Sequence, residues 1–224
     1  MKFGKIDYLN LLPFHVFLKR SSLKSYTKKS IEHKKDVPAK LNKALKKNQI
    51  DAAVISSIES RYKKYKILNM GIVAKRDVKS VLVRKNSKNK KDPASASSNM
   101  LAKILNIDGE VIIGDRALKA YLTDGDECFY DLANIWYKKT GLPFVFGRLT
   151  CAKYTSFYKS LTKNFTKRPV KIPQYILEQY SQTRKIEKEK IIWYLKYISY
   201  KIETKEQKSY RLFLRKAREL GFKA

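Results

Sequence analysis

Short blocks of apolar and polar positions alternate along the N-terminal part of the chain. Residues 2–7 predict a strand, and the segment after Pro13 predicts a helix because its apolar positions recur on one stripe. A second amphipathic helix begins at Pro38, a residue that the first turn of a helix tolerates. Residues 51–55 form a continuous apolar run, typical of a buried parallel strand. This β-α-β order indicates an α/β sheet.

The middle of the chain continues the alternation, and the C-terminal part does not. The further predicted strands are residues 67–73, 78–83, 110–115 and 144–146. The predicted helices between them are residues 100–105 and 130–139. After Cys151 the pattern predicts helices at residues 154–162, 173–180, 185–200 and 205–220. We therefore expect two α/β units followed by a helical C-terminal tail.

Composition limits the kind of protein this can be. The chain has 224 residues, of which 43% are hydrophobic and 12% aromatic, enough for one large or two small packed domains. Intrinsic disorder of the whole chain is excluded. Its two cysteines, Cys128 and Cys151, allow neither a disulfide framework nor a cysteine-rich zinc module, which favours a reducing compartment.

The strong positive charge raises the question of a nucleic-acid partner. Lys and Arg number 50 against 20 Asp and Glu, for a formal net charge of +30, but only 11 of the 50 are Arg. Arg suits specific base and phosphate recognition, whereas Lys suits almost any exposed position. We interpret the excess as a solvated lysine-rich surface and expect no specific nucleic-acid partner. Non-specific binding, which rests on charge alone, stays open as an alternative.

The apolar run at residues 8–18 is similar to the central part of a signal peptide. Asn10 and Pro13 interrupt it, Lys19 and Arg20 close it, and no small-residue cleavage site follows. The rest of the sequence has no apolar run of the roughly 18 residues that a membrane span needs. We expect a cytoplasmic protein without a membrane partner.

The residues that usually carry catalysis are few. The histidines are His15 and His33, and His15 is expected to be a packed histidine because it lies in an apolar helix. Neither histidine has cysteines or carboxylates at metal-ligand spacing, and no phosphate-binding, dinucleotide-binding or nucleophile-elbow motif occurs. We expect no metal and no cofactor.

Small polar residues stand where the predicted strands meet helices. Asn10 follows the first strand, and the serines at such positions are Ser56, Ser57, Ser80, Ser95, Ser97 and Ser98. The carboxyl ends of strands line the ligand crevice of α/β sheets, and a helix N-terminus with free N–H groups binds anions. These residues predict a cradle for a carboxylate ligand, although each serine alone is equally explained as a helix cap.

Six motifs in order carry a family resemblance. They are Gly4-x-Ile6-x-Tyr8-Leu9-Asn10-x-x-Pro13, Ser56-Ser57-Ile58-Glu59 after Asp51, Ser80-Val81-x-Val83, Ser95-x-Ser97-Ser98, Ile113-Gly114-Asp115-x-Ala117-Leu118, and Asp131-Leu132 with Trp136 and Thr140-Gly141-Leu142-Pro143-Phe144-Val145-Phe146. In this order the motifs resemble the chorismate dehydratase family of the futalosine pathway of menaquinone biosynthesis.

The resemblance implies a two-lobed fold of the type II periplasmic-binding-protein kind. Lobe one would comprise residues 1–78 and 148–224, and lobe two residues 79–147. It also implies a hydro-lyase that binds chorismate, with Asn10 as the catalytic residue and the serines as substrate-binding residues. Two alternatives stay open: Glu59 as the base, and a non-catalytic protein of the same fold that binds a small carboxylate. The sequence does not set the oligomeric state.

Overall fold

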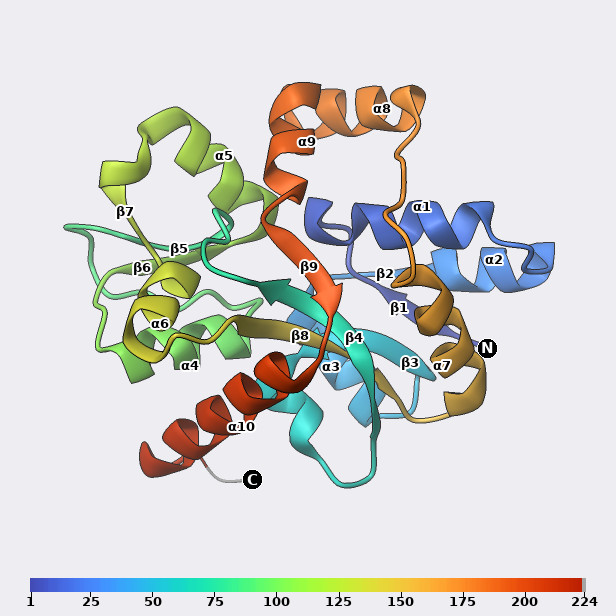
Figure 1. Ribbon diagram of the computed structural model, residues 1–224, viewed down its shortest axis with the longest axis horizontal. Coiled ribbons are helices and arrows are strands. Elements are labelled where there is room, and N and C mark those ends of the chain that lie inside the picture. Colours follow the sequence, from blue (N-terminus) through green and yellow to red (C-terminus); the bar gives the residue numbers. More distant parts are fainter. Residues whose placement is uncertain (223–224) are drawn as a thin grey trace.

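The computed structural model describes residues 1–222, apart from the side chains of Glu32 and His33, and arranges them around two β-sheets (Figure 1). Within these residues the larger sheet has six strands in the order β2-β1-β3-β8-β4-β9. Their bounds are β1 Phe3–Lys5, β2 Lys34–Lys35, β3 Ala52–Ser56, β4 Lys66–Ala74, β8 Phe144–Cys151 and β9 Ile198–Lys201. β1 is parallel to β2 and β3, whereas β8 is antiparallel to β3 and β4 and β9 is antiparallel to β4.

The smaller sheet comes from the middle of the chain. In the described part of the protein it has three antiparallel strands in the order β6-β5-β7. Their bounds are β5 Val81–Arg84, β6 Glu110–Ile113 and β7 Phe129–Asp131. Helices α4 (Ala96–Leu105), α5 (Gly114–Asp124) and α6 (Leu132–Thr140) pack against it.

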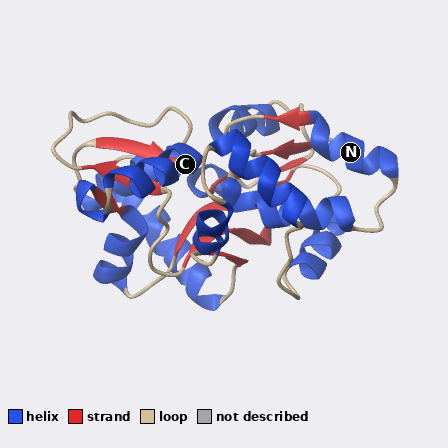
Figure 2. Ribbon diagram, turned by 90° about the horizontal axis from the view of Figure 1, so that it is seen from above, coloured by secondary structure: helices blue, strands red, loops and turns tan. Residues whose placement is uncertain are grey.

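The remaining helices surround the larger sheet and reach over the smaller one. They are α1 Leu12–Arg20, α2 Ser25–His33, α3 Pro38–Lys46, α7 Thr155–Phe165, α8 Gln174–Arg184, α9 Lys188–Leu195 and α10 Thr204–Glu219. The short 3₁₀ turns are η1 Leu9–Leu11, η2 Ser57–Arg61 and η3 Asp126–Cys128. Seen from above, the two groups of strands lie side by side with helices around them (Figure 2). None of the helices within residues 1–222 combines the length and the apolar character that crossing a bilayer requires.

Strand β8 is the centre of the larger sheet. All eight of its residues are buried between β3 and β4. A side chain at Gly71 on β4 would collide with the carbonyl oxygen of Gly147 on β8, so the two backbones approach each other only because Gly71 has none. The strand register shifts just before Gly71, which fits the local irregularity that glycine permits.

The predicted strand at residues 78–83 begins later than expected, at Val81. The N–H groups of Val78 and Lys79 both donate to Asp131 Oδ2 at 2.9 Å, so a side chain takes the bonds that a strand neighbour would use. Lys79 also has a φ of 58°, in the left-handed region that ends regular strands. Ser80 therefore lies in the connection before the strand rather than within it.

Two other element predictions were wrong at their edges. The predicted helix at 130–139 begins at Leu132, because Asp131 caps it by accepting the N–H groups of Ala133 and Asn134, and residues 129–131 form β7. The predicted helix at 185–200 ends at Leu195, and Ile198–Lys201 instead forms β9 at the edge of the larger sheet. The C-terminal tail is thus mainly helical with one strand.

The hydrophobic core is continuous between the two sheets. Trp136 on α6 makes edge-on ring contacts with Phe144 on β8 and Phe213 on α10. Its indole N–H donates to Ser209 Oγ at 3.0 Å, so the polar end of this buried ring is also satisfied. These contacts fix the helix α6 of the smaller sheet against the larger sheet.

Candidate functional site

The turns η1 and η2 meet the helices α5 and α4 between the two sheets. β1 and β3 are adjacent parallel strands, so the turns that follow them, η1 and η2, leave from the same edge of the sheet. η1 contacts α5 and η2 contacts α4, both from the smaller sheet. The sequence-predicted residues of η1, η2 and the start of α4 are therefore neighbours at one edge.

Serine hydroxyls join η2 to α4. Ser57 Oγ lies 3.0 Å from Ser97 Oγ, and Ser97 Oγ accepts the N–H of Ile58 at 3.2 Å. Ser57, Ile58 and Ser97 are fully buried. We call this set the hydroxyl cluster. It connects elements of the two sheets without any charged group.

Two further serines bond within the first turn of α4. Ser95 is the N-cap: its Oγ accepts the N–H of Ser98 at 3.2 Å and donates to Ser98 Oγ at 2.7 Å. Capping thus accounts for Ser95, as the alternative explanation held. The pair still presents two buried hydroxyls and a helix N-terminus beside the hydroxyl cluster.

Ser56 and Ser80 have partners of their own. Asn42 on α3 accepts the N–H of Ser56 at 3.2 Å and donates to its Oγ at 3.3 Å. Ser80 Oγ lies 2.8 Å from the hydroxyl of Tyr194 on α9, and its carbonyl accepts the N–H of Gly114 at 2.8 Å. Ser80 therefore stands between the tail and the start of α5.

Asn10 is held through its backbone carbonyl. Its carbonyl accepts the hydroxyl of Tyr200 at 2.7 Å. The residue is 8% exposed, and its Oδ1 has no hydrogen-bond partner among the described residues. Because a buried amide oxygen without a donor is costly, this atom is suited to accept a hydrogen bond from a ligand.

A second set of contacts, which is charged, joins η1 to α5. Asp115 in the first turn of α5 accepts the N–H of Leu9 at 2.9 Å and pairs with Arg184 Nε at 2.7 Å. Arg184 Nη2 also donates to the carbonyl and the carboxylate of Asp7, at 2.8 and 3.1 Å. We call Asp7, Asp115 and Arg184 the ionic cluster.

Burial and charge affect the two carboxylates of the ionic cluster differently. Burial raises the pKa of Asp7, but Lys5 and Arg184 outweigh that effect, so its pKa lies below the usual value. At Asp115 burial dominates and raises the pKa, although Leu9 and Arg184 oppose it. Burial, with Asp92 and Asp115 nearby, raises the pKa of Tyr8 to about 12, so its hydroxyl stays protonated at neutral pH.

Comparison with known proteins identifies the family. A family profile described as menaquinone biosynthesis matches residues 1–107 and 94–219, which together span nearly the whole chain. The chain belongs to the menaquinone biosynthesis family. One relative, the chorismate dehydratase of Campylobacter jejuni subsp. jejuni, is 51% identical over 222 residues and 99% of each chain is covered. The resemblance found in the sequence motifs is thereby confirmed.

Solved structures confirm the fold class. A protein of Archaeoglobus fulgidus matches with a TM-score of 0.72 at 14% identity, covering 99% of this chain and 98% of its own. The periplasmic aliphatic sulphonate binding protein SsuA of Escherichia coli matches with a TM-score of 0.57 at 15% identity, covering 100% and 94%. A Candida albicans protein with the generic periplasmic binding protein fold gives 0.55 at 13%, covering 100% and 92%. This member of the menaquinone biosynthesis family has the periplasmic-binding-protein-like fold.

The hydroxyl cluster, the ionic cluster, Asn10 and the remaining serines together form what we call the polar network. The sequence pointed to part of this network in this family member and missed the rest. It singled out Asn10 and the serines, which the structure gathers around η1, η2 and the starts of α4 and α5. It gave Asp115 no role, although the residue belongs to one of the six motifs, and it gave Arg184 none. No local pattern marks Arg184, because its partners are far away in the sequence.

Among the described residues, no three His, Cys, Asp or Glu side chains gather as metal ligands would. His15 is buried, and its Nε2 lies 3.0 Å from the carbonyl of Ile6, the position of a packed histidine. Cys151 is buried, which raises the pKa of its thiol to about 12, so this thiol is inert at neutral pH.

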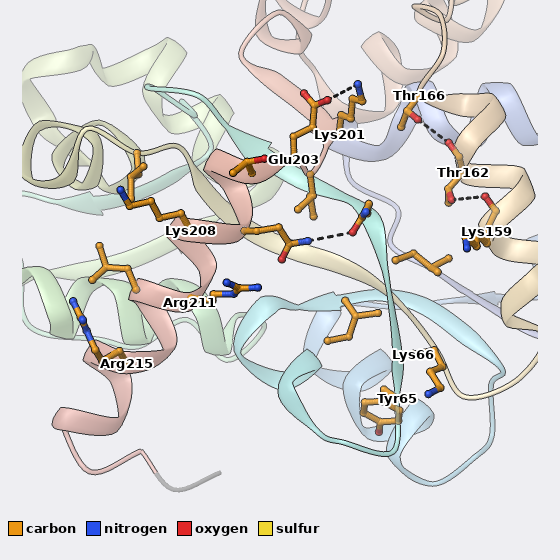
Figure 3. Close-up of a pocket in the computed structure, with 18 of the residues that line it drawn as sticks. Tyr65, Lys66, Lys159, Thr162, Thr166, Lys201, Glu203, Lys208, Arg211 and Arg215 are labelled. Carbon is orange, nitrogen blue, oxygen red and sulfur yellow. Dashed lines mark hydrogen bonds and ion pairs between the residues drawn. The ribbon is translucent and has the colours of Figure 1, made fainter.

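One large groove lies away from the polar network. Its volume is about 1910 Å³, and many Lys and Arg side chains of β4, α7 and α10 line it, among them Lys66, Lys159 and Arg211 (Figure 3). A second cavity, of about 700 Å³, is lined mainly by apolar side chains of residues 165–172, α9 and β9. Asn10 and the six serines line neither of these two cavities, so neither cavity marks the proposed site.

Proposed function

We propose that the protein is a chorismate dehydratase that converts chorismate into 3-[(1-carboxyvinyl)oxy]benzoate, the first step of the futalosine route to menaquinone. The relative that is 51% identical over the full length supports this reaction. The polar network that joins the two sheets supports a small, strongly hydrogen-bonding substrate. A cytoplasmic location stays a prediction of the sequence.

The reaction is a 1,2-elimination. The proton on the ring carbon that carries the enolpyruvyl ether is removed, the neighbouring hydroxyl leaves, and together they form water. The electron pair of the C–H bond becomes the last double bond of a benzene ring, so aromatisation drives the step. A weak base suffices if it is well placed. The reaction needs no electron acceptor, in keeping with the expectation of no cofactor.

The observation that carries the proposed site is Asn10 Oδ1, which is buried where η1 meets α5 and has no hydrogen-bond partner within the part of the chain that the structure describes. In the proposed mechanism the Asn10 amide hydrogen-bonds either the departing hydroxyl, from which Oδ1 can accept, or the enolpyruvyl carboxylate, to which the amide NH₂ can donate. That carboxylate, tethered near the ring proton, is the base, so proximity replaces a protein side chain. Glu59 on η2 is the alternative protein base.

The serines form the proposed cradle for the two carboxylates of chorismate. Ser56 ends β3 and Ser57 begins η2. The other serines are Ser95, Ser97 and Ser98 at the N-cap and first turn of α4, and Ser80 in the connection between the sheets. Their hydroxyls now bond one another or neighbouring side chains, so substrate would exchange some of these bonds for its own. Hydroxyls suit this exchange because each can donate or accept.

We also propose the two-lobed division, with lobe one at 1–78 and 148–224 and lobe two at 79–147. The larger sheet draws strands from both ends of the chain and the smaller sheet from its middle, which supports a division of this kind. Residues 144–147, which the proposed boundary gives to lobe two, are nevertheless the first half of β8 in the larger sheet. Substrate would then lie between the lobes and hold them together.

The activity test is incubation with chorismate, with the aromatic product followed by its ultraviolet absorbance. Tight binding without product would favour the non-catalytic carboxylate binder. Replacing Asn10 by Ala should lower kcat by about 10²- to 10³-fold, with a much smaller change in chorismate affinity. Asn164→Ala, an exposed asparagine on α7, is the matched control. If Asn10→Ala keeps near-normal turnover while Glu59→Gln abolishes it with binding intact, Glu59 is the base and the substrate-assisted mechanism is wrong.

A further inference from the structure

The ionic cluster holds the backbone on the N-terminal side of Asn10. Asp115 Oδ1 accepts the N–H of Leu9 at 2.9 Å, and Asp115 Oδ2 pairs with Arg184 Nε at 2.7 Å. Because both oxygens are engaged, the carboxylate cannot turn away from Leu9 without breaking an ion pair.

Arg184 is itself anchored at the end of β1. Its Nη2 donates to the carbonyl of Asp7 at 2.8 Å and to the Asp7 carboxylate at 3.1 Å. One guanidinium therefore spans from the residue before Tyr8 to the first turn of α5. A planar, rigid fork can bridge two such partners, whereas a lysine ammonium on a flexible stem cannot hold the same geometry.

The C-terminal side of Asn10 is held as well. Tyr200 on β9 donates its hydroxyl to the Asn10 carbonyl at 2.7 Å. The backbone of Asn10 is thus fixed from both sides, while its Oδ1 has no partner among the described residues. A side chain that acts on a substrate needs this kind of support, because an error of about 1 Å in its position can cost about 10²-fold in rate.

Gly114 provides an independent sign that α5 must come close to η1. Its φ is 67°, and a Cβ at this position would lie 3.0 Å from the ring of Tyr8. Asp115 is the next residue. The carboxylate reaches Leu9 because the residue before it has no side chain to push Tyr8 and η1 away.

We propose that Asp115, oriented by Arg184, is a positioning residue for Asn10. It fixes the backbone at Leu9 and thereby aims the Asn10 amide at the reacting atoms. This inference rests on the proposed dehydratase function and on the proposed role of Asn10. It also means that Asn10 is aimed only while α5 contacts η1, so the arrangement of the reactive amide depends on the contact between elements of the two sheets.

The single variants are Asp115→Asn and Arg184→Lys. Asp115→Asn keeps the size of the side chain but sets an amide against Arg184, and we expect kcat to fall about 10- to 100-fold while the KM for chorismate stays close to the wild-type value. Arg184→Lys keeps the charge and should cause a smaller fall in kcat. The matched control is Asp124→Asn on the same helix, whose partner Arg84 lies 2.8 Å away on an exposed surface, and which should leave kcat unchanged.

The decisive measurement is a double-mutant cycle. If Asp115 acts through Asn10, Asp115→Asn should cause no further loss of rate in the Asn10→Ala background, measured in single-turnover reactions with enzyme in excess. Circular dichroism and thermal unfolding show that each variant is folded. If Asp115→Asn does not fold, the same cycle with Arg184→Lys replaces it.

Two results would overturn the positioning role. One is an equal loss of rate from Asp115→Asn in the wild-type and Asn10→Ala backgrounds. The other is a lowered melting temperature with kcat unchanged. Near-normal turnover of Asn10→Ala alone would instead contradict the proposed role of Asn10, so the two failures are distinguishable.

Discussion

The two sets of contacts that join the sheets differ in chemistry. The hydroxyl cluster connects η2 to α4 through neutral groups that are fully buried. The ionic cluster connects η1, the end of β1 and α8 to α5 through charged groups, and parts of Asp7 and Arg184 reach solvent.

The difference suggests a division of roles. A hydroxyl donates or accepts with little change of geometry, so its bonds can be exchanged for those of a substrate. A carboxylate held by a guanidinium fork has a fixed direction and charge, which suits it to hold backbone in place. In the proposed mechanism, substrate contact is therefore assigned to the serines, and the placement of η1 to Asp115 and Arg184.

The largest stability effect should come from the hydroxyl cluster. Ser97→Ala leaves the N–H of Ile58 and the hydroxyl of Ser57 buried without this partner, so the free energy of unfolding should fall by about 2 kcal/mol. Urea unfolding measures it, with Ser160→Ala, an exposed serine on α7, as the control. A loss no larger than that of the control would show that the cluster contributes little to folding.

A pH series should separate the two clusters. Because the pKa of Asp7 is lowered in the folded protein, Asp7 stabilises the fold above its usual pKa of 3.8, and this contribution is lost as the pH falls through the lowered value. The raised pKa of Asp115 has the opposite effect on the free energy of unfolding. That free energy falls as the pH rises through the folded pKa of Asp115, because burial disfavours the charged carboxylate and Arg184 and Leu9 offset this only in part. The hydroxyl cluster has no group that titrates, so the effect of Ser97→Ala should not change between acid and neutral pH.

Removing the guanidinium should raise the pKa of Asp7. In Arg184→Gln the carboxylate keeps Lys5 and the hydroxyl of Tyr180 but loses its pairing with Arg184. The Asp7 carboxyl resonance, followed by NMR during an acid titration, measures the shift. An unchanged Asp7 midpoint would mean that Arg184 does not stabilise the ionised form.

Salt should have the smallest effect. Raising NaCl from 0.05 to 1 M should reduce the difference in unfolding free energy between wild type and Arg184→Gln by a few tenths of a kcal/mol, because screening reaches partly exposed charges. The difference between wild type and Ser97→Ala should not respond. If salt changed the difference for Arg184→Gln and the difference for Ser97→Ala equally, the view that only the ionic cluster depends on charge would be wrong.

The sequence predicted the fold class and the neighbourhood of the polar network, because both depend on local patterns. Apolar runs gave β3 and β6, and the segments that hold Asn10 and Ser56 leave the same edge of the sheet because β1 and β3 are parallel neighbours. The periodicity did not reveal β9, a short edge strand that depends on its pairing with β4. Nor did it reveal the partners of Arg184, since Asp7 is 177 residues away and Asp115 is 69. The lobe boundaries and the roles of the site residues stay predictions.

The pairing of Ala74 with Phe144 has a consequence for how the chain is built. These residues are direct partners at the ends of β4 and β8. Everything from residue 75 to residue 143, including the whole smaller sheet, is therefore an insertion at the turn of a single β-hairpin. Because no strand pair of the larger sheet uses an inserted residue, a two-residue turn in its place would keep that sheet's entire hydrogen-bond ladder. In topology, β4 and β8 are the two strands of a hairpin, and the smaller sheet with its helices takes the place of the turn between them.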